Sequence, residues 1–391
     1  MKLSLRLFSD VTYYFCLSCY IAVFCFSNSS FTEVFNFNPK FFSYIYWIIC
    51  ILLSALFSLS YILYKFKEKF FFFSVIYLFS AAIASLMVGN DLSILIGTLL
   101  ILDMKGRKAR TSIFCVFLTY ATCAIAIVTS ALCGFIPNKE VFGVDPFKVN
   151  GVLKRHTYGF MQVNVLGVVL LVLFLCFFVL FVKKLSSLFF LFSLCLCLIL
   201  YFIINSKTAA FIIPVTIIIY ISLLNIKKCL KVFASSLLVV PYIFSMILVF
   251  NYSTHNSFLV RINNMLSNRI SLAKEIYSSY GFSLLGRNIH LISTVQAKKM
   301  NLNALVLDNA YFHLMIRYGL LMTICFIILY FAQISLFSER KFLKILTVCI
   351  VFFLCGISET WMLRTEINFT LLCILPCLNE AKKQEYSFEE K

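Results

Sequence analysis

The chain has 391 residues, of which 62% are hydrophobic and only 13% are charged, whereas a soluble globular domain is about half apolar and about a quarter charged. This composition excludes an ordinary soluble protein and indicates a polytopic membrane protein. The net charge of +18 would suggest nucleic acid in a soluble protein, but here the cations gather in short connections between apolar runs, which is a topology signal. We therefore expect a lipid bilayer and no nucleic acid as partner.

A helix that spans a membrane needs roughly 20 apolar residues. The sequence predicts an all-α membrane domain over residues 1–391 with about twelve such helices, of which the fourth and twelfth are short enough to be broken, tilted or partly re-entrant. The first apolar run follows Lys2 and Arg6 as in a signal peptide, but the many later spans favour an uncleaved first span. The predicted spans lie near residues 11–27, 41–64, 70–88, 91–103, 111–133, 163–182, 186–204, 208–225, 232–251, 310–335, 342–358 and 366–379.

Positive charge sets the predicted orientation, because Lys and Arg accumulate in short cytoplasmic connections. With the N-terminus in the cytoplasm, the short outer connections carry only Lys40, Lys207 and Arg364. Both termini, including the tail 380–391, are therefore predicted to be cytoplasmic. The cations of the cytoplasmic connections are Lys65, Lys67, Lys69, Lys105, Arg107, Lys108, Arg110, Lys183, Lys184, Lys227, Lys228, Lys231, Arg340, Lys341, Lys344, Lys382 and Lys383.

Two long polar loops fall on the predicted outer side, residues 134–162 and residues 252–309, the second between the ninth and tenth spans. Their cations are not explained by topology, since the rule counts cytoplasmic charges. They form either a solvated loop surface or an anion site, and guanidinium groups suit phosphate because they bind it bidentately and stay charged. The cations concerned are Lys139, Lys148, Lys154, Arg155, Arg261, Arg269, Lys274, Arg287, Lys298 and Lys299, with Arg317 shortly after the second loop.

Two short stretches outside the large loop are candidates for binding phosphate. Arg155 lies at the outer mouth of the sixth predicted span, where it is either an interfacial arginine or a phosphate clamp. Lys207 lies in a tight turn between apolar runs. Ser206 and Thr208 beside it can cap the next helix, whose N-terminus attracts anions.

The large loop and the spans after it supply the candidate acid–base groups. The pattern around residues 263–272 predicts a short helix capped near Ser267 or Asn268, and the tyrosines that follow either pack the loop or stack on sugar rings. Asp308 is the cap of the tenth helix, a general base, or both. His313 and Arg317 are expected one turn apart on one helix face, and Glu359 is either functional or paired with Arg364.

The sixteen cysteines do not indicate a disulfide framework, because nearly all lie within apolar runs and neither long loop contains one. The outer loops also lack a clustered Asp-x-Asp or a His/Cys set at ligand spacing. We therefore expect neither a metal nor another cofactor.

Over roughly residues 90–370 the chain resembles the O-antigen and capsular polysaccharide polymerases, the Wzy family, and more distantly the O-antigen ligases. The ligases typically carry a His-Asn pair where this chain has Asp308-Asn309, which favours a polymerase. The motifs that carry the resemblance are Arg155 with Gly159-Phe160 and Asn164, Ser206-Lys207-Thr208 in place of Ser-Arg-Thr, Leu266-Ser267-Asn268-Arg269-Ile270, Leu285-Gly286, Asp308-Asn309-Ala310-Tyr311 with Tyr318-Gly319, and Glu359.

The resemblance implies glycosyl transfer between two undecaprenyl-diphosphate-linked oligosaccharides on the outer face of the bacterial plasma membrane, with a fold similar to the GT-C glycosyltransferases. It also implies that the flippase and chain-length regulator of the same pathway are partners. The expected catalytic residues are Asp308, Arg269 and Arg155, and the expected substrate-binding residues are Arg261, Arg287, Arg317, Lys207, Asn309, Tyr311, His313 and Glu359.

Two alternatives stay open at this point. A flippase or other transporter of lipid-linked oligosaccharide would fit paired halves, charged residues within the helices and short outer loops, and the sequence shows the reverse. An O-antigen ligase would join finished polymer to a lipid or protein acceptor.

Overall fold

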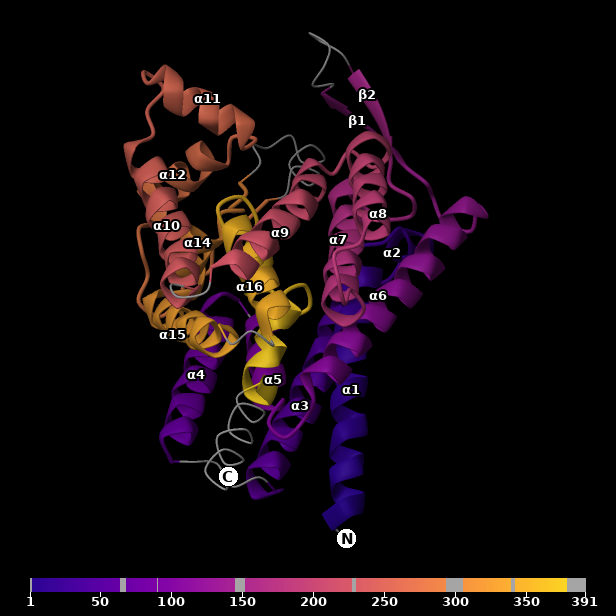
Figure 1. Ribbon diagram of the computed structural model, residues 1–391, viewed down its shortest axis with the longest axis vertical. Coiled ribbons are helices and arrows are strands. Elements are labelled where there is room, and N and C mark those ends of the chain that lie inside the picture. Colours follow the sequence, from indigo (N-terminus) through magenta and orange to yellow (C-terminus); the bar gives the residue numbers. More distant parts are fainter. Residues whose placement is uncertain are drawn as a thin grey trace. The chain divides into compact units, whose positions relative to one another are not determined.

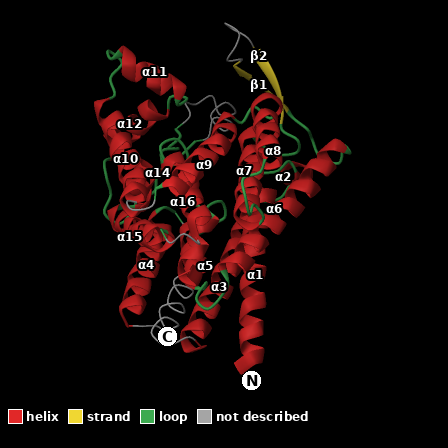
Figure 2. Ribbon diagram, viewed as in Figure 1, coloured by secondary structure: helices red, strands yellow, loops and turns green. Residues whose placement is uncertain are grey.

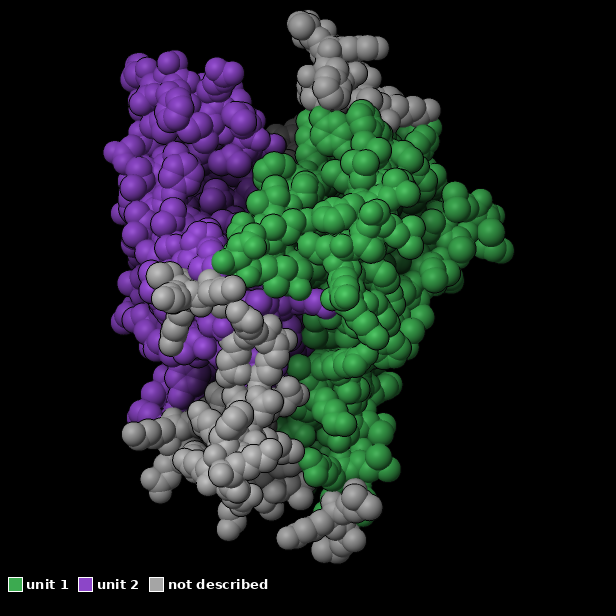
Figure 3. Space-filling view, viewed as in Figure 1, with its two compact units in different colours: residues 1–63, 103–225 green, residues 64–102, 226–391 purple. Residues whose placement is uncertain are grey.

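The computed structural model describes residues 2–63, 68–89, 91–144, 152–226, 230–292, 305–338 and 342–377. These residues are mostly helical, and their one sheet is a two-stranded hairpin (Figure 2). They form two compact units, residues 1–63 with 103–225 and residues 64–102 with 226–391 (Figure 3). The predicted cytoplasmic tail 380–391 and the loop cations Lys148, Lys298 and Lys299 lie outside the described residues.

The prediction of an all-α membrane protein is confirmed. Within the described ranges, seven helices are long and apolar enough to cross a bilayer, and four apolar helices are shorter. The seven are Ser4–Ser27, Lys40–Leu59, Ala109–Leu132, Val163–Leu180, Lys207–Asn225, Val232–Asn251 and Leu320–Phe337. The four shorter ones are Phe72–Met87, Ser93–Leu102, Ser187–Ile203 and Leu343–Cys355.

The first unit is a bundle of long apolar helices. Helix α1 (Lys2–Ser27) packs against α3 (Pro39–Leu63) and α6 (Ala109–Leu132), and α7 (Val163–Leu180) packs against α6 and α9 (Lys207–Asn225). Small residues permit this close packing: a Cβ atom added at Gly167 of α7 would lie 2.1 Å from Ser206 Oγ. The remaining helices of the unit are α2 (Phe31–Val34), α8 (Ser187–Leu198) and the π-helix η1 (Ile199–Ile203).

The loop 134–162 contains a β-hairpin that the sequence did not predict. Strands β1 (Glu140–Val144) and β2 (Val152–His156) pair antiparallel, with Arg155 opposite Val141. Neither strand alternates strictly between apolar and polar residues, so the pattern that indicates a strand is missing. Arg155 thus belongs to β2 (Figure 1), shortly before α7 begins at Val163.

The second unit contains α4 (Glu68–Met87), α5 (Ser93–Leu102), α10 (Leu230–Asn251), α15 (Leu320–Phe337) and α16 (Leu343–Cys355). Helix α15 packs against α4, α10 and α16. Two short helices, α11 (Ser257–Met265) and α12 (Arg269–Tyr280), lie beyond the end of α10 (Figure 1). The described part of the unit also contains four single helical turns. They are α14 (Ala310–His313), the π-helix η2 (Leu314–Tyr318), and the 3₁₀ helices η4 (Thr360–Leu363) and η5 (Phe369–Cys373).

The prediction of one continuous helix over residues 310–335 is wrong. Gly319 has a φ of +94° and ends the helical turns α14 and η2, and α15 begins at Leu320. A Cβ atom at Gly319 would lie 2.4 Å from Gly286 N, so only glycine fits where these two segments meet. The residues before the break therefore form a separate turn, not the first part of a membrane span.

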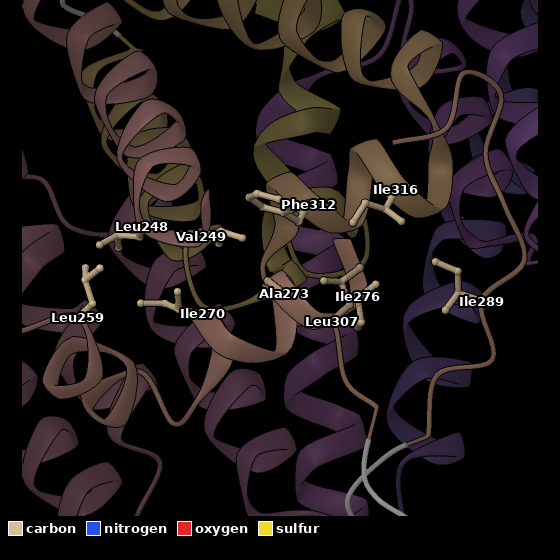
Figure 4. Packing of buried hydrophobic residues seen from close by; sticks show 10 residues of the cluster. All are labelled: Leu248, Val249, Leu259, Ile270, Ala273, Ile276, Ile289, Leu307, Phe312 and Ile316. Carbon is tan, nitrogen blue, oxygen red and sulfur yellow. The ribbon is translucent and has the colours of Figure 1, made fainter. Parts of the chain in front are cut away.

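Buried apolar side chains fix the short helices α11 and α12 to the membrane helices. Figure 4 shows side chains from α10, α12 and the α14–η2 turns gathered into one cluster. Fully burying one such side chain contributes about 1.5–3 kcal/mol. Phe312 of α14 also has its ring within 6.1 Å of Phe250, Tyr277 and Phe282. The cluster comprises Leu248, Val249, Leu259, Ile270, Ala273, Ile276, Ile289, Leu307, Phe312 and Ile316.

Candidate active site

The turn between α11 and α12 is held by one buried amide side chain. Asn263 is 3% exposed, and its Oδ1 accepts hydrogen bonds from Ile270 N at 3.1 Å and Ser271 N at 3.0 Å. Its Nδ2 lies 3.1 Å from Asn268 Oδ1 and 3.2 Å from the Tyr252 hydroxyl. Asn268 itself has a φ of +64°, a conformation that asparagine tolerates better than most residues. Helix α12 consequently starts at Arg269, close to the predicted position.

Replacing Asn263 by Ala should lower the free energy of opening the turn between α11 and α12 by about 2–4 kcal/mol. The reason is that the N–H groups of Ile270 and Ser271 lose their acceptor. Hydrogen–deuterium exchange over residues 257–280 should then become faster. The matched control is Asn264→Ala, one residue further on, whose side chain is exposed. Equal exchange rates in the two variants would show that Asn263 does not hold the turn.

Arg269 lies between two carboxylates that come from distant parts of the chain. Its Nε is 3.1 Å from Asp308 Oδ2, and its Nη1 is 2.9 Å from Glu359 Oε1. The side chains of Arg269 and Glu359 are 16% and 14% exposed, and that of Asp308 is 34% exposed. Arg269, Asp308 and Glu359, here called the Arg269 site, thus combine a partly buried cation with two candidate bases.

Asp308 does not cap the helix that follows it, so that interpretation is wrong. The cap is Asn309, whose Oδ1 accepts from Tyr311 N and Phe312 N, both at 3.1 Å. Its Nδ2 donates to Ser245 Oγ at 2.6 Å and to the Ile357 carbonyl at 3.1 Å, which ties α14 to α10 and to the segment after α16. Both ends of the Asn309 amide therefore hold α14 in position. The Asp308 carboxylate is not needed as a cap and contacts Arg269.

The environment of Asp308 suits a proton acceptor. Burial raises the pKa of the Asp308 carboxyl, and the charge and hydrogen bond of Arg269 oppose this only in part, so the pKa stays above its usual value. A general base works best when its pKa approaches the working pH. The Asp308 carboxylate is thus a stronger base than a solvated aspartate.

Arg364 contacts an acid close to it along the chain. Its Nη2 and Nε both lie 2.6 Å from Glu366 Oε1. Glu366 is 2% exposed, so this pair satisfies a buried acid within the same short turn. Glu359 contacts Arg269 from the preceding turn.

A second ion pair joins the α4–α5 connection to η2. Arg317 Nη2 is 3.3 Å from Asp91 Oδ2, and the Tyr318 hydroxyl donates to the same oxygen at 3.2 Å. Ser93 donates to Asp91 Oδ1 through its hydroxyl, at 2.6 Å, and through its N–H, at 3.2 Å. Burial raises the pKa of Asp91, but Ser93 and Arg317 outweigh it and the pKa lies below its usual value. Asp91 is therefore an anion that holds Arg317.

His313 is enclosed and neutral. Burial, together with the Arg317 guanidinium, lowers the pKa of His313 to about 4, and its Nδ1 donates to the Leu307 carbonyl at 2.9 Å. The π-helical turn places its ring 5.3 Å from that of Tyr318, five residues on. The turn thus places the His313 ring between Tyr318 and the Leu307 carbonyl, and close enough to Arg317 for that charge to act on it.

The segment around Gly286 is strapped to η2 and the start of α15. Arg287 N donates to the Arg317 carbonyl at 2.8 Å, Ser283 N to Met315 at 3.3 Å, Leu320 N to Ser283 at 2.8 Å and Leu321 N to Leu284 at 3.1 Å. The side chain of Arg287 is exposed, and its guanidinium donates to the Tyr280 carbonyl. We call residues 283–287 the strap.

The other predicted site residues lie in varied surroundings. Arg261 is exposed on α11, and Tyr311 is 1% exposed and donates to the Phe353 carbonyl at 2.6 Å. Arg155 and Lys207 belong to the first unit, the latter exposed as the first residue of α9. Arg155 Nε is buried without a hydrogen-bond partner among the described residues, and burial lowers the pKa of this guanidinium.

The structure therefore brings Arg269, Asp308 and Glu359 together and gives Arg317 a different partner. Asn263 and Ser245 were not predicted to matter here. In the part of the chain that the structure describes, no group of three or more His, Cys, Asp or Glu side chains could hold a metal ion. No protein-family model, no curated protein and no solved structure matches this chain.

Proposed function

We propose that this chain is an integral-membrane glycosyltransferase that polymerises undecaprenyl-diphosphate-linked oligosaccharide repeat units into surface polysaccharide, O-antigen or capsule. The reaction takes place on the outer face of the bacterial plasma membrane. About twelve membrane passes, a GT-C-like fold and cytoplasmic termini are parts of the same proposal. The observation that carries it is the Arg269 site, in which an arginine and two carboxylates meet on a polar helical hairpin packed against membrane helices.

In the proposed reaction, Asp308 is the general base. Its carboxylate accepts the proton of the acceptor sugar hydroxyl, and the hydroxyl oxygen forms a bond to the anomeric carbon of the donor glycan. The bond between that carbon and the donor's diphosphate oxygen breaks, and undecaprenyl diphosphate leaves with the electron pair. The raised pKa of Asp308 supports this assignment, since it makes the carboxylate a better proton acceptor.

Arg269 is proposed to act in two ways. It orients Asp308 through the contact between Nε and Oδ2, and it supplies positive charge where the diphosphate leaves. A guanidinium presents five N–H donors, so a phosphate can bind an edge of Arg269 while one carboxylate stays in contact. Arg261 and Arg287 are exposed on the same unit and supply further charge for the phosphates. Arg155 and Lys207 of the first unit are proposed phosphate-binding residues as well.

The test is reconstitution of the purified protein in vesicles with lipid-linked repeat units on the face that bears residues 252–309. The expected result is a ladder of polymer on a gel, which lengthens with time. Movement of the glycolipid across the vesicle membrane without lengthening would overturn the proposal in favour of a transporter. Transfer of preformed polymer to a separate lipid or protein acceptor would overturn it in favour of a ligase.

A further inference from the structure

A pocket of about 400 Å³ lies in the first unit where α6 begins and α7 ends. Both helices are among those long enough to cross a bilayer. The loop 134–162 connects their opposite ends, so the pocket lies at the end of this helix pair away from that loop. The residues that line it are Lys108, Arg110, Thr111, Phe114, Leu180 and Phe181.

The lining combines positive charge with apolar surface. Lys108 and Arg110 are exposed, and neither makes an ion pair within the described part of the chain. Phe114 and Phe181 are 47% and 45% exposed, and the ring of Phe181 lies 5.8 Å from that of Phe117 of α6. One side of the pocket thus suits an anion, and the other suits hydrocarbon.

The neighbouring acids do not neutralise these two cations. The first turn of α6 contains no acid. Asp10 of α1 lies 3.1 Å from Arg107 Nε, and Asp103 is 0% exposed. Lys183 and Lys184, which follow Phe181, are exposed and add further positive charge beside the pocket. The local charge is therefore positive and available to an outside partner.

We propose that this pocket binds an anionic phospholipid of the surrounding bilayer. The phosphate contacts Lys108 and Arg110, and the acyl chains lie along Phe114, Leu180 and Phe181. Basic pockets between membrane helices recognise anionic head groups, and the charge near an anionic leaflet adds to the attraction. The proposal concerns a structural lipid at the helix end away from the loop 134–162, so it stands independently of the proposed glycosyl transfer.

The experiment measures lipid binding to the purified full-length protein by native mass spectrometry and by its thermal unfolding, with phosphatidylglycerol and phosphatidylcholine as probes. The wild-type protein should bind and be stabilised by phosphatidylglycerol in preference to phosphatidylcholine. The double variant Lys108→Gln, Arg110→Gln should bind phosphatidylglycerol about 25-fold more weakly, since each cation near an anionic surface is worth roughly fivefold.

Two further variants separate the pocket from general surface charge. Lys183→Gln, Lys184→Gln removes the same charge beside the pocket and should keep most of the preference. Thr111→Phe keeps the charge but fills the pocket, and should lose lipid binding while the lipid-free protein unfolds at an unchanged temperature. The proposal is overturned if the wild-type protein binds both lipids equally, if the two double variants weaken binding alike, or if Thr111→Phe binds normally.

Discussion

Replacing Asp308 by Asn is expected to slow chain elongation by about a hundred- to ten-thousandfold, the usual contribution of a general base. The amide has the same shape and can still accept a hydrogen bond from Arg269 Nε, which lies 3.1 Å from Oδ2 in the wild-type protein. It cannot take up the proton of the acceptor hydroxyl. The measurement is the initial rate of polymer formation in vesicles at saturating lipid-linked repeat unit, with the melting temperature as a check on folding.

Glu275→Gln is the matched control, because Glu275 is an exposed acid on α12, the helix that begins at Arg269. It should keep the wild-type rate. The pH dependence gives an independent readout. The pKa of Asp308 is raised, so the wild-type rate should increase with pH through that pKa and fall as the carboxyl becomes protonated below it. An Asp308→Asn protein that elongates at the wild-type rate would remove Asp308 from the mechanism.

Replacing Arg269 by Ala is expected to lower the elongation rate by about a hundred- to a thousandfold, comparable to the loss of one donor that stabilises developing negative charge. The change leaves the carboxylates of Asp308 and Glu359 without their shared cation. Arg269→Lys keeps the charge but cannot present two N–H edges to two partners, so its rate should lie between those of Ala and the wild type. The same vesicle assay measures both variants.

Glu359→Gln serves as the comparison for Arg269, because it removes one partner and leaves the pair with Asp308. Its loss of rate should be smaller than that of Arg269→Ala. Arg269 lowers the pKa of Asp308 through its charge and its hydrogen bond. A lysine that lies farther from the carboxylate lowers the pKa of Asp308 less. As the pH falls, the elongation rate of Arg269→Lys should therefore decrease at a higher pH than that of the wild type. A full wild-type rate in Arg269→Ala would contradict both proposed roles.

The membrane helices could be predicted from the sequence because a long apolar run has few other ways to satisfy its backbone in a bilayer. The break at Gly319 could not, since mostly apolar residues on both sides of it fit one helix as well as two. The constraint there is steric and comes from Gly286, which is distant in sequence but only 2.4 Å from a Cβ atom at Gly319. The local sequence pattern around Gly319 does not indicate its contact with Gly286.

The Arg269 site, like the fold, could be predicted from the sequence only in part. Arg269, Asp308 and Glu359 could each be chosen from the sequence, because ionisable groups beside apolar spans are costly without a purpose. Their pairing could not, since it depends on the packing of α12, α14 and the segment after α16. The three residues lie far apart in the sequence, so no local pattern indicates their contacts at 3.1 and 2.9 Å.

The strap has a mechanical consequence for the protein in its membrane. Backbone hydrogen bonds from Leu320 N and Leu321 N attach the first turn of α15 directly to residues 283 and 284. A spanning helix changes its tilt when the thickness of the bilayer changes. A change in the tilt of α15 would therefore also move the strap, which ends at Arg287.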